Sequence, residues 1–361
     1  MANEQIFVLG SDHNLWLEQP PYGWQIPPQR TLVDGNVDFF AAFQAISVNE
    51  VFVCGSDGNL WLEQGGFGQV PLPDTSTFPP GSGQRYQIDG SVGAFQAMTT
   101  GEIFVLGQDG NLWFEFGFGT TSPTVPPPRT QVDGNVITFE ALSLKEVFVL
   151  GSDGNLWQEL GPFGTVPLPS CNGQGLGCRN QVDGNVAFFS PVDSGHVFVV
   201  GSDGNLWLEL GPFGQQIPPR RVHVDDNVAD VLPVSAEDVF VLDRYGNLWR
   251  EHAPFGQIPL PPCSETSGFG KGFGCRDLIH RRVAGYGFFD DTIFIIDFDL
   301  NLIQISQGPP TTIDRNVIDF HPLTSNLMMS RRNQLRRARR LREMREGEIW
   351  RLTPAPLAPS M

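Results

Sequence analysis

The sequence predicts an all-β protein, a seven-bladed β-propeller built from four-stranded antiparallel blades. Three observations lead to this expectation. One segment recurs seven times along the 361 residues, each copy has the pattern of a β-hairpin, and the end of the chain holds a strand that the first copy lacks. Repeats spaced 42 to 54 residues apart with four short strands each are typical of propeller blades.

The repeated segment reads VFVLGSDGNLWQE in its fourth copy, which runs from Val147 to Glu159. The other copies begin at Ile6, Val51, Ile103, Val197, Val239 and Ile293. Every copy has Phe at its second position, as expected of a residue that packs between neighbouring blades. Because one blade cannot bury both of its faces, we expect one closed array rather than separate domains.

Four strands are expected in each repeat, and the fourth repeat shows them in order. Residues 136–143 and 146–151 are rich in β-branched and aromatic residues and are predicted to be strands. The following Asp-Gly pair predicts a hairpin with a type I′ turn, which leads into a strand over residues 155–160. A Pro-rich connection then precedes the outer strand near residue 179.

The ring is expected to close through the end of the chain. The segment from Asn316 to Ser325 matches the inner strand of the second blade, and the first blade has no such strand before residue 6. Pairing of these two segments would remove the free sheet edges. We therefore assign residues 1–325 to the propeller and residues 326–361 to a basic C-terminal tail, which the sequence leaves open as helical or disordered.

Charge and composition argue against several classes of protein. The net charge of −17 argues against a nucleic-acid surface. Residues 331–361 hold nine Arg and three acidic residues, a net charge of +6, so the preceding residues carry −23. The sequence has no apolar run of transmembrane length, and no signal peptide precedes the first copy.

Four of the five cysteines fall into two close pairs at equivalent places in the repeats, namely Cys171 with Cys178 and Cys263 with Cys275. We expect two local disulfides, which favour an oxidising, extracellular compartment. Four unpaired thiols remain the alternative. Cys54 replaces a Leu of the repeat and is expected to be a small core residue.

Three columns of residues are candidates for ligand binding. Each of the first six copies has a Trp, a Glu two residues later and an Arg in the outer strand. The Trp column is Trp16, Trp61, Trp113, Trp157, Trp207 and Trp249. The Glu column is Glu18, Glu63, Glu115, Glu159, Glu209 and Glu251, and the Arg column is Arg30, Arg85, Arg129, Arg179, Arg221 and Arg276. In the seventh copy Ile303, Ile305 and Pro310 replace all three, so the columns are expected to interact. Both a structural clamp within each blade and a ring of sugar pockets fit this pattern.

A second aromatic column lies in the connection to the outer strand, and each member is followed by Gly. It consists of Tyr22, Phe67, Phe118, Phe163, Phe213 and Phe255. Loop aromatics of this kind are candidates for stacking on a ligand, and a plug that holds the loop to the protein is the alternative. We expect no catalytic residues, metal or cofactor, because no nucleophile–base pair, metal motif or phosphate loop occurs in the repeats.

The hairpin followed by Leu-Trp resembles the blades of the PLL-type propeller lectins and, more loosely, those of the tectonins, over roughly residues 1–325. The resemblance implies a propeller and, in that family, binding of fucose-like sugars between blades with the help of Trp residues on the outer strand. The outer segments VPPPRTQVDG and IPPRRVHVDD contain no Trp. We therefore transfer the fold and no sugar-binding residue.

The expected function is that of a multivalent, lectin-like carbohydrate-binding protein with repeated shallow sites, whose partners are glycans or glycoproteins. Several weak sites gain avidity when they engage one surface together. A protein-interaction scaffold without sugar specificity is the alternative, and a glycan-active propeller enzyme is a more distant third.

Overall fold

A computed structural model describes residues 5–38, 43–73, 83–117, 126–171, 175–266, 274–289, 291–306 and 308–323. Phe118 and the basic tail predicted over residues 326–361 lie outside these residues, so the predictions for them and the domain boundary at residue 325 stay predictions.

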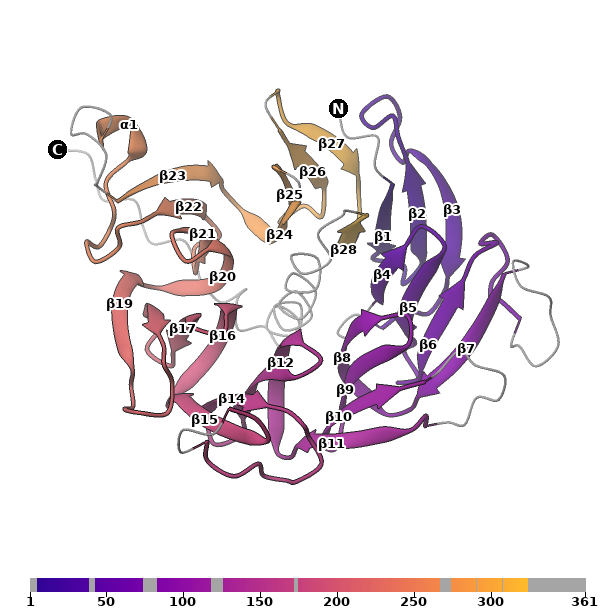
Figure 1. Cartoon of the computed structure of the whole chain (residues 1–361). Coiled ribbons are helices and arrows are strands. Elements are labelled where there is room, and N and C mark those ends of the chain that lie inside the picture. Colours follow the sequence, from indigo (N-terminus) through magenta and orange to yellow (C-terminus); the bar gives the residue numbers. More distant parts are fainter. Residues whose placement is uncertain are drawn as a thin grey trace.

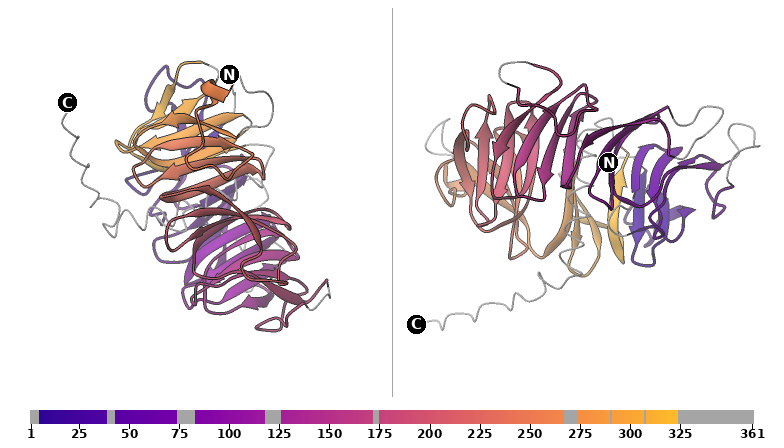
Figure 2. Two further views of the ribbon diagram at one scale, coloured as in Figure 1. Left: turned by 90° about the vertical axis from the view of Figure 1, so that its left-hand side faces the viewer. Right: turned by 90° about the horizontal axis from the view of Figure 1, so that it is seen from below.

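Seven four-stranded antiparallel sheets form the described part of the chain and stand as blades around a central axis (Figure 1). The predicted all-β, seven-bladed propeller is therefore confirmed. Seen from the side, the ring is a thick disc with the strands running across it (Figure 2).

In blades 2 to 7 the strands follow in chain order from the axis outward, whereas blade 1 begins with the last strand of the chain. Blade 1 contains β28 (Val317–Pro322), β1 (Ile6–Gly10), β2 (Leu15–Gln19) and β3 (Gln29–Asp34). Blade 2 contains β4 (Phe43–Ser47), β5 (Glu50–Cys54), β6 (Leu60–Gln64) and β7 (Gln84–Asp89). Blade 3 contains β8 (Val92–Thr99), β9 (Glu102–Gly107), β10 (Leu112–Phe116) and β11 (Arg129–Asp133). Blade 4 contains β12 (Val136–Ser143), β13 (Glu146–Gly151), β14 (Leu156–Leu160) and β15 (Cys178–Asp183).

The remaining blades repeat this arrangement. Blade 5 contains β16 (Val186–Asp193), β17 (His196–Gly201), β18 (Leu206–Leu210) and β19 (Arg220–Asp225). Blade 6 contains β20 (Val228–Ser235), β21 (Asp238–Asp243), β22 (Leu248–His252) and β23 (Cys275–His280), with the short helix α1 (Cys263–Thr266) before its outer strand. Blade 7 contains β24 (Val283–Phe289), β25 (Thr292–Asp297), β26 (Leu302–Ile305) and β27 (Thr311–Asp314).

The ring closes as predicted. β28 pairs antiparallel with β1, from Ile6 opposite Pro322 to Leu9 opposite Asp319. Residues more than 300 positions apart in the chain thus lie side by side in one sheet (Figure 1). This pairing gives blade 1 its inner strand, so that β1 has a neighbouring strand on both sides.

The repeated hairpin is confirmed, but its turn is not the predicted type I′ turn. In blade 2 the Gly55 N–H donates a hydrogen bond to Asn59 O at 2.9 Å, and this bond closes a loop of three residues, 56–58. Of these only Gly58 has a positive φ, 78°. Asp57 instead accepts hydrogen bonds from the backbone and side-chain amides of Asn59. The Gly therefore supplies the left-handed residue of a three-residue loop, and the Asp stabilises it through its side chain.

The hydrophobic core is divided among the spaces between blades. Phe7 of blade 1, for example, lies 6.4 Å from Phe43 of blade 2, and both belong to one buried cluster with Leu15 and Val53. Phe294 of blade 7 meets Phe320 of blade 1 in the same way, with 5.7 Å between ring centres. The Phe column thus packs between neighbouring blades, as the sequence predicts.

Candidate binding grooves between the blades

The six glutamates of the Glu column are completely buried, with 0% of each side chain exposed. Each lies on the third strand of its blade, directly opposite the Arg of the outer strand, as Glu115 lies opposite Arg129. No ligand in solvent can reach their carboxyl groups without opening the blade interface.

An aspartate at the end of the preceding blade faces each of these glutamates. The six aspartates are Asp314, Asp34, Asp89, Asp133, Asp183 and Asp225, in the order of the glutamates. Burial raises the pKa of Glu115 to about 9, and the negative charge of Asp89 adds to the shift. The other five are perturbed for the same reasons, with the pKa of Glu209 raised to about 8. Each interface therefore favours a protonated Glu beside an Asp.

The arginine joins the two acidic residues across the interface. Arg129 Nη1 lies 3.4 Å from Asp89 Oδ2 of blade 2 and 3.6 Å from Glu115 Oε1 of its own blade. Arg221 and Arg276 make the equivalent pairs of contacts at 3.7 to 3.9 Å. The predicted Glu–Arg proximity is thus present, but the unit extends over two blades rather than one.

In the six blades that have the repeated Trp, the guanidinium of the Arg lies over the Trp ring. The guanidinium carbon lies 4.0 to 4.2 Å from the ring centre in all six blades. This is a cation–π contact between two half-buried side chains. One face of the Trp is therefore already covered by a residue of the protein.

The seventh interface shows why the columns disappear together. His280 of blade 6 stands where the other blades have the bridging Asp, because it pairs with Leu248 as Asp183 pairs with Leu156. Opposite it, blade 7 has Ile303 and Ile305, which pack against the cluster containing Phe288. The Trp, Glu and Arg are therefore lost together at one interface between two blades. The Asp of the preceding blade is lost with them, a fourth position that comparison of single repeats does not reveal.

The described loop aromatics reach across to the preceding blade. Phe163 of blade 4 meets Phe104 of blade 3 edge-on, with 6.1 Å between ring centres. Phe67, Phe213 and Phe255 repeat this contact with the Phe column at 6.2 Å. Tyr22 packs against the cluster between blades 7 and 1 and donates its hydroxyl to Glu18 O at 3.2 Å. These contacts provide a structural role, and stacking on a ligand stays a prediction.

A cavity of about 280 Å³ lies between blades 3 and 4. It is lined by Trp157, Arg179, Asp133 and Asn135, and by Val166 of the connection. Neither His nor Cys lines it. Such a cavity can accept a polar group through hydrogen bonds and an apolar group against Val166.

The connections also present a row of apolar side chains, which the sequence analysis missed. It consists of Ile26, Val70, Val166 and Ile217, each at the same place before a Pro and 36 to 51% exposed. Val70 lies beside Gly35 of blade 1, and Val166 lies beside Gly134 of blade 3. At these two places the row therefore lies where one connection meets the end of the preceding blade. Its signal in the sequence is the repeated β-branched residue before Pro in IPP and VPLP.

Both predicted disulfides are present, Cys171–Cys178 and Cys263–Cys275. Cys54 is buried and is not part of a disulfide, as predicted. In the described residues no helix is both long and apolar enough to span a membrane.

Comparison with known proteins identifies no family for this chain. No family model matches the sequence, and no curated protein matches it. Among solved structures, the WD40 β-propeller domain of Doa1 is similar, with 12% identity, a TM-score of 0.48, and coverage of 85% of this chain and 88% of that chain. Prp20p from Saccharomyces cerevisiae is similar with 12% identity, a TM-score of 0.46 and 96% coverage of both chains. The fold assignment itself rests on the strand pairing described above, and no match supports the lectin family.

Proposed function

We propose that this propeller is a multivalent scaffold that binds a partner protein along the grooves between its blades. The observation that carries the proposal is the row of Ile26, Val70, Val166 and Ile217. Each of these side chains keeps 36 to 51% of its surface exposed, and an apolar residue that recurs at one exposed position of the repeat is a candidate contact for a partner. Trp24, in the same connection as Ile26, is 88% exposed and provides an aromatic anchor of the kind that dominates interfaces.

The charge beside the row suggests the chemistry of the partner. Asp57, Asp109, Asp153 and Asp203 are exposed on the neighbouring hairpin turns. Hydrogen bonds from Asn155, its backbone amide first, keep the pKa of Asp153 below its usual value, so this residue is charged at neutral pH. A partner that combines apolar side chains with Lys or Arg complements such a groove, and several equivalent grooves add avidity.

Two valines of equal exposure in blade 2 allow a matched test. Val70 belongs to the row, whereas Val48 lies in the turn between β4 and β5, and both are 36% exposed. Partners captured by the wild-type protein should be lost with Val70→Glu combined with Val166→Glu and retained with Val48→Glu. Added salt should weaken the capture, because the groove is acidic. Equal capture by the row variant and the Val48 variant would contradict the proposal.

The cavity between blades 3 and 4 favours a second candidate, binding of a glycan. Trp157, Arg179 and Asn135 combine an aromatic edge with hydrogen-bonding groups in one small space. A glycan array probed with the folded protein tests this candidate directly. Binding that Val166→Glu abolishes supports it, and an array without signal removes it.

A further inference from the structure

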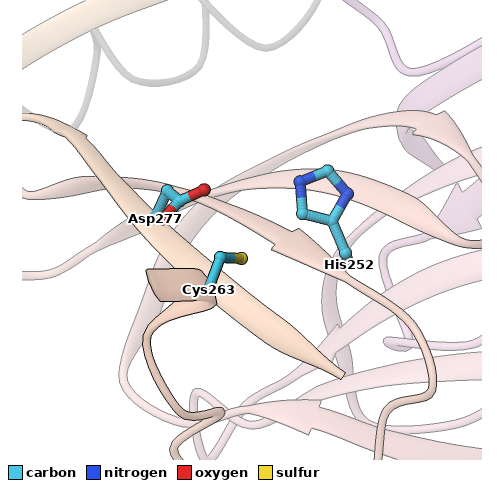
Figure 3. A group of neighbouring side chains, drawn as sticks. All are labelled: His252, Cys263 and Asp277. Carbon is cyan, nitrogen blue, oxygen red and sulfur yellow. The ribbon is translucent and has the colours of Figure 1, made fainter. Parts of the chain in front are cut away.

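We propose that the Cys263–Cys275 disulfide conceals a zinc site, which forms with His252 and Asp277 when the disulfide is reduced. Figure 3 shows His252, Cys263 and Asp277 converging on one side of blade 6. Their ligand atoms all lie within 4.8 Å of one another. Cys275 adds a fourth donor, because it is bonded to Cys263 and pairs with His252 across β22 and β23.

The donor set is one that Zn²⁺ prefers. Structural zinc sites are four-coordinate and use Cys thiolates, His nitrogens and carboxylate oxygens at about 2.0 to 2.3 Å. Two thiolates, one imidazole and one carboxylate would complete a tetrahedral shell. In the disulfide neither sulfur is a thiolate, so the oxidised protein lacks half of the ligands.

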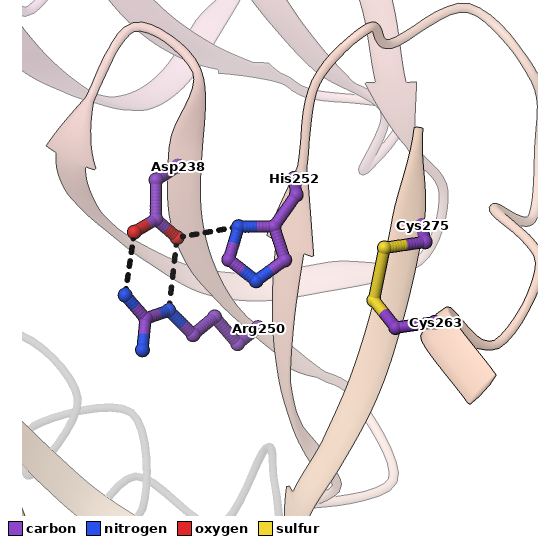
Figure 4. Close-up of a disulfide and its surroundings, with 5 residues drawn as sticks. All are labelled: Asp238, Arg250, His252, Cys263 and Cys275. Carbon is purple, nitrogen blue, oxygen red and sulfur yellow. Dashed lines mark hydrogen bonds and ion pairs between the residues drawn. A yellow bond between two sulfur atoms is a disulfide. The ribbon is translucent and has the colours of Figure 1, made fainter. Parts of the chain in front are cut away.

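A residue that orients His252 is already in place. Asp238 Oδ1 lies 3.4 Å from His252 Nδ1, and Asp238 is held by two hydrogen bonds from Arg250 (Figure 4). A carboxylate on one ring nitrogen fixes the proton there and leaves the other, Nε2, as the metal ligand. This carboxylate–histidine arrangement is common behind bound zinc.

Blade 4 supplies a comparison within the same chain. Its disulfide, Cys171–Cys178, occupies the equivalent place, but Leu160 stands where blade 6 has His252, and Asn180 stands where it has Asp277. The two blade 4 cysteines are also buried, whereas Cys263 and Cys275 are half-buried. A reductant therefore has better access to blade 6, and only there do further ligands surround the thiols.

The chemistry requires a reductant, which a water-soluble phosphine provides. The phosphine attacks one sulfur and breaks the S–S bond. Water then releases it as the phosphine oxide, so the phosphine supplies the two electrons and both sulfurs become thiols. Binding of Zn²⁺ then displaces one proton from each thiol.

The test uses Co²⁺ as a spectroscopic probe in the Cys171→Ser, Cys178→Ser variant, which retains only the blade 6 pair. After reduction with the phosphine, we expect one Co²⁺ per chain with thiolate-to-cobalt charge-transfer absorption and the strong visible bands of four-coordinate cobalt. Zn²⁺ should displace the Co²⁺. Without reduction neither absorption should appear.

Three substitutions separate the proposed site from bare thiols. His252→Leu and Asp277→Asn introduce the residues that blade 4 has at these positions, Leu160 and Asn180. We expect His252→Leu to weaken Co²⁺ binding more than tenfold. Asp238→Asn leaves all four ligands and should weaken binding by about 10- to 100-fold. Near-UV circular dichroism verifies the fold of each variant. The proposal is overturned if the reduced protein binds no four-coordinate Co²⁺, or if His252→Leu binds it as tightly as the parent.

Discussion

Arg129 Nη1 lies 3.4 Å from Asp89 Oδ2, so the outer strand of blade 3 is tied to the end of the outer strand of blade 2. The same guanidinium rests on Trp113 and faces the buried Glu115. Equivalent sets recur at six of the seven interfaces in the described part of the chain. The repeated segment thus encodes the junction between blades as well as the blade itself.

Removing the arginine should destabilise this junction. Arg129→Met leaves Asp89 without its cation, and we expect unfolding to become easier by about 1 to 3 kcal/mol, at the lower end because the Arg is one-third exposed. Adding Asp89→Asn should restore part of the loss, since it removes the unpaired charge. Urea unfolding of the two single variants and the double variant measures the coupling. Additive losses would show that the two residues do not interact.

The pH dependence of stability follows from the glutamates. Their pKa values are raised from 4.5 to about 8 or 9 in the folded protein, so between these values the folded chain binds more protons than the unfolded chain. The stabilisation that these glutamates contribute is therefore fully present below about pH 4.5. It decreases as the pH rises toward 9, by at most about 1.4 kcal/mol per pH unit for each Glu. Thermal unfolding from pH 5 to 9 should show a falling Tm. A Tm that rises over this range would refute the assignment.

A buried loop aromatic should contribute more to stability than an exposed aromatic residue at the end of a strand. Phe213 is 6% exposed and packs on Phe148, whereas Phe116 is 39% exposed. We expect Phe213→Ala to cost about 3 kcal/mol and Phe116→Ala less than about 1 kcal/mol. Chemical unfolding of both variants provides the comparison. Equal effects would mean that the connection of blade 5 is not held by its aromatic residue.

Each disulfide should stabilise the fold by closing its loop in the unfolded chain. The paired cysteines are separated by 7 and 12 residues, which predicts a loss of about 2 to 3 kcal/mol when either pair is replaced by Ser. Thermal unfolding of the two double variants measures both losses. A loss near zero for one pair would show that its loop is equally restricted without the bond.

Much of the fold could be predicted because the repeat carries its information locally. Alternation, turn residues and the matching segment at residues 316–325 were sufficient for the blade, the number of blades and the closure through β28. The turn type was predicted wrongly because the Asp-Gly pair does not reveal loop length. Hydrogen bonding of Gly55 to Asn59 determines that length, and it depends on the strand register.

The site was harder to predict because its contacts join different repeats. The sequence groups Glu115, Arg129 and Trp113 in one copy, but Asp89 belongs to the copy before it. The exposure of Val70 and Val166 also depends on how each connection lies over the preceding blade. Neither property can be derived from the periodicity of a single repeat.

The central claim is that the repeated columns join neighbouring blades and that the six glutamates among them are sealed from solvent. NMR of protein labelled with ¹³C at the glutamate carboxyl carbon tests it most directly, with one Glu→Gln variant per signal for assignment. The account predicts six carboxyl groups that stay protonated at pH 7 and titrate between about pH 8 and 9. Titration of these six groups near pH 4.5 in the folded protein, as for exposed glutamates, would contradict it.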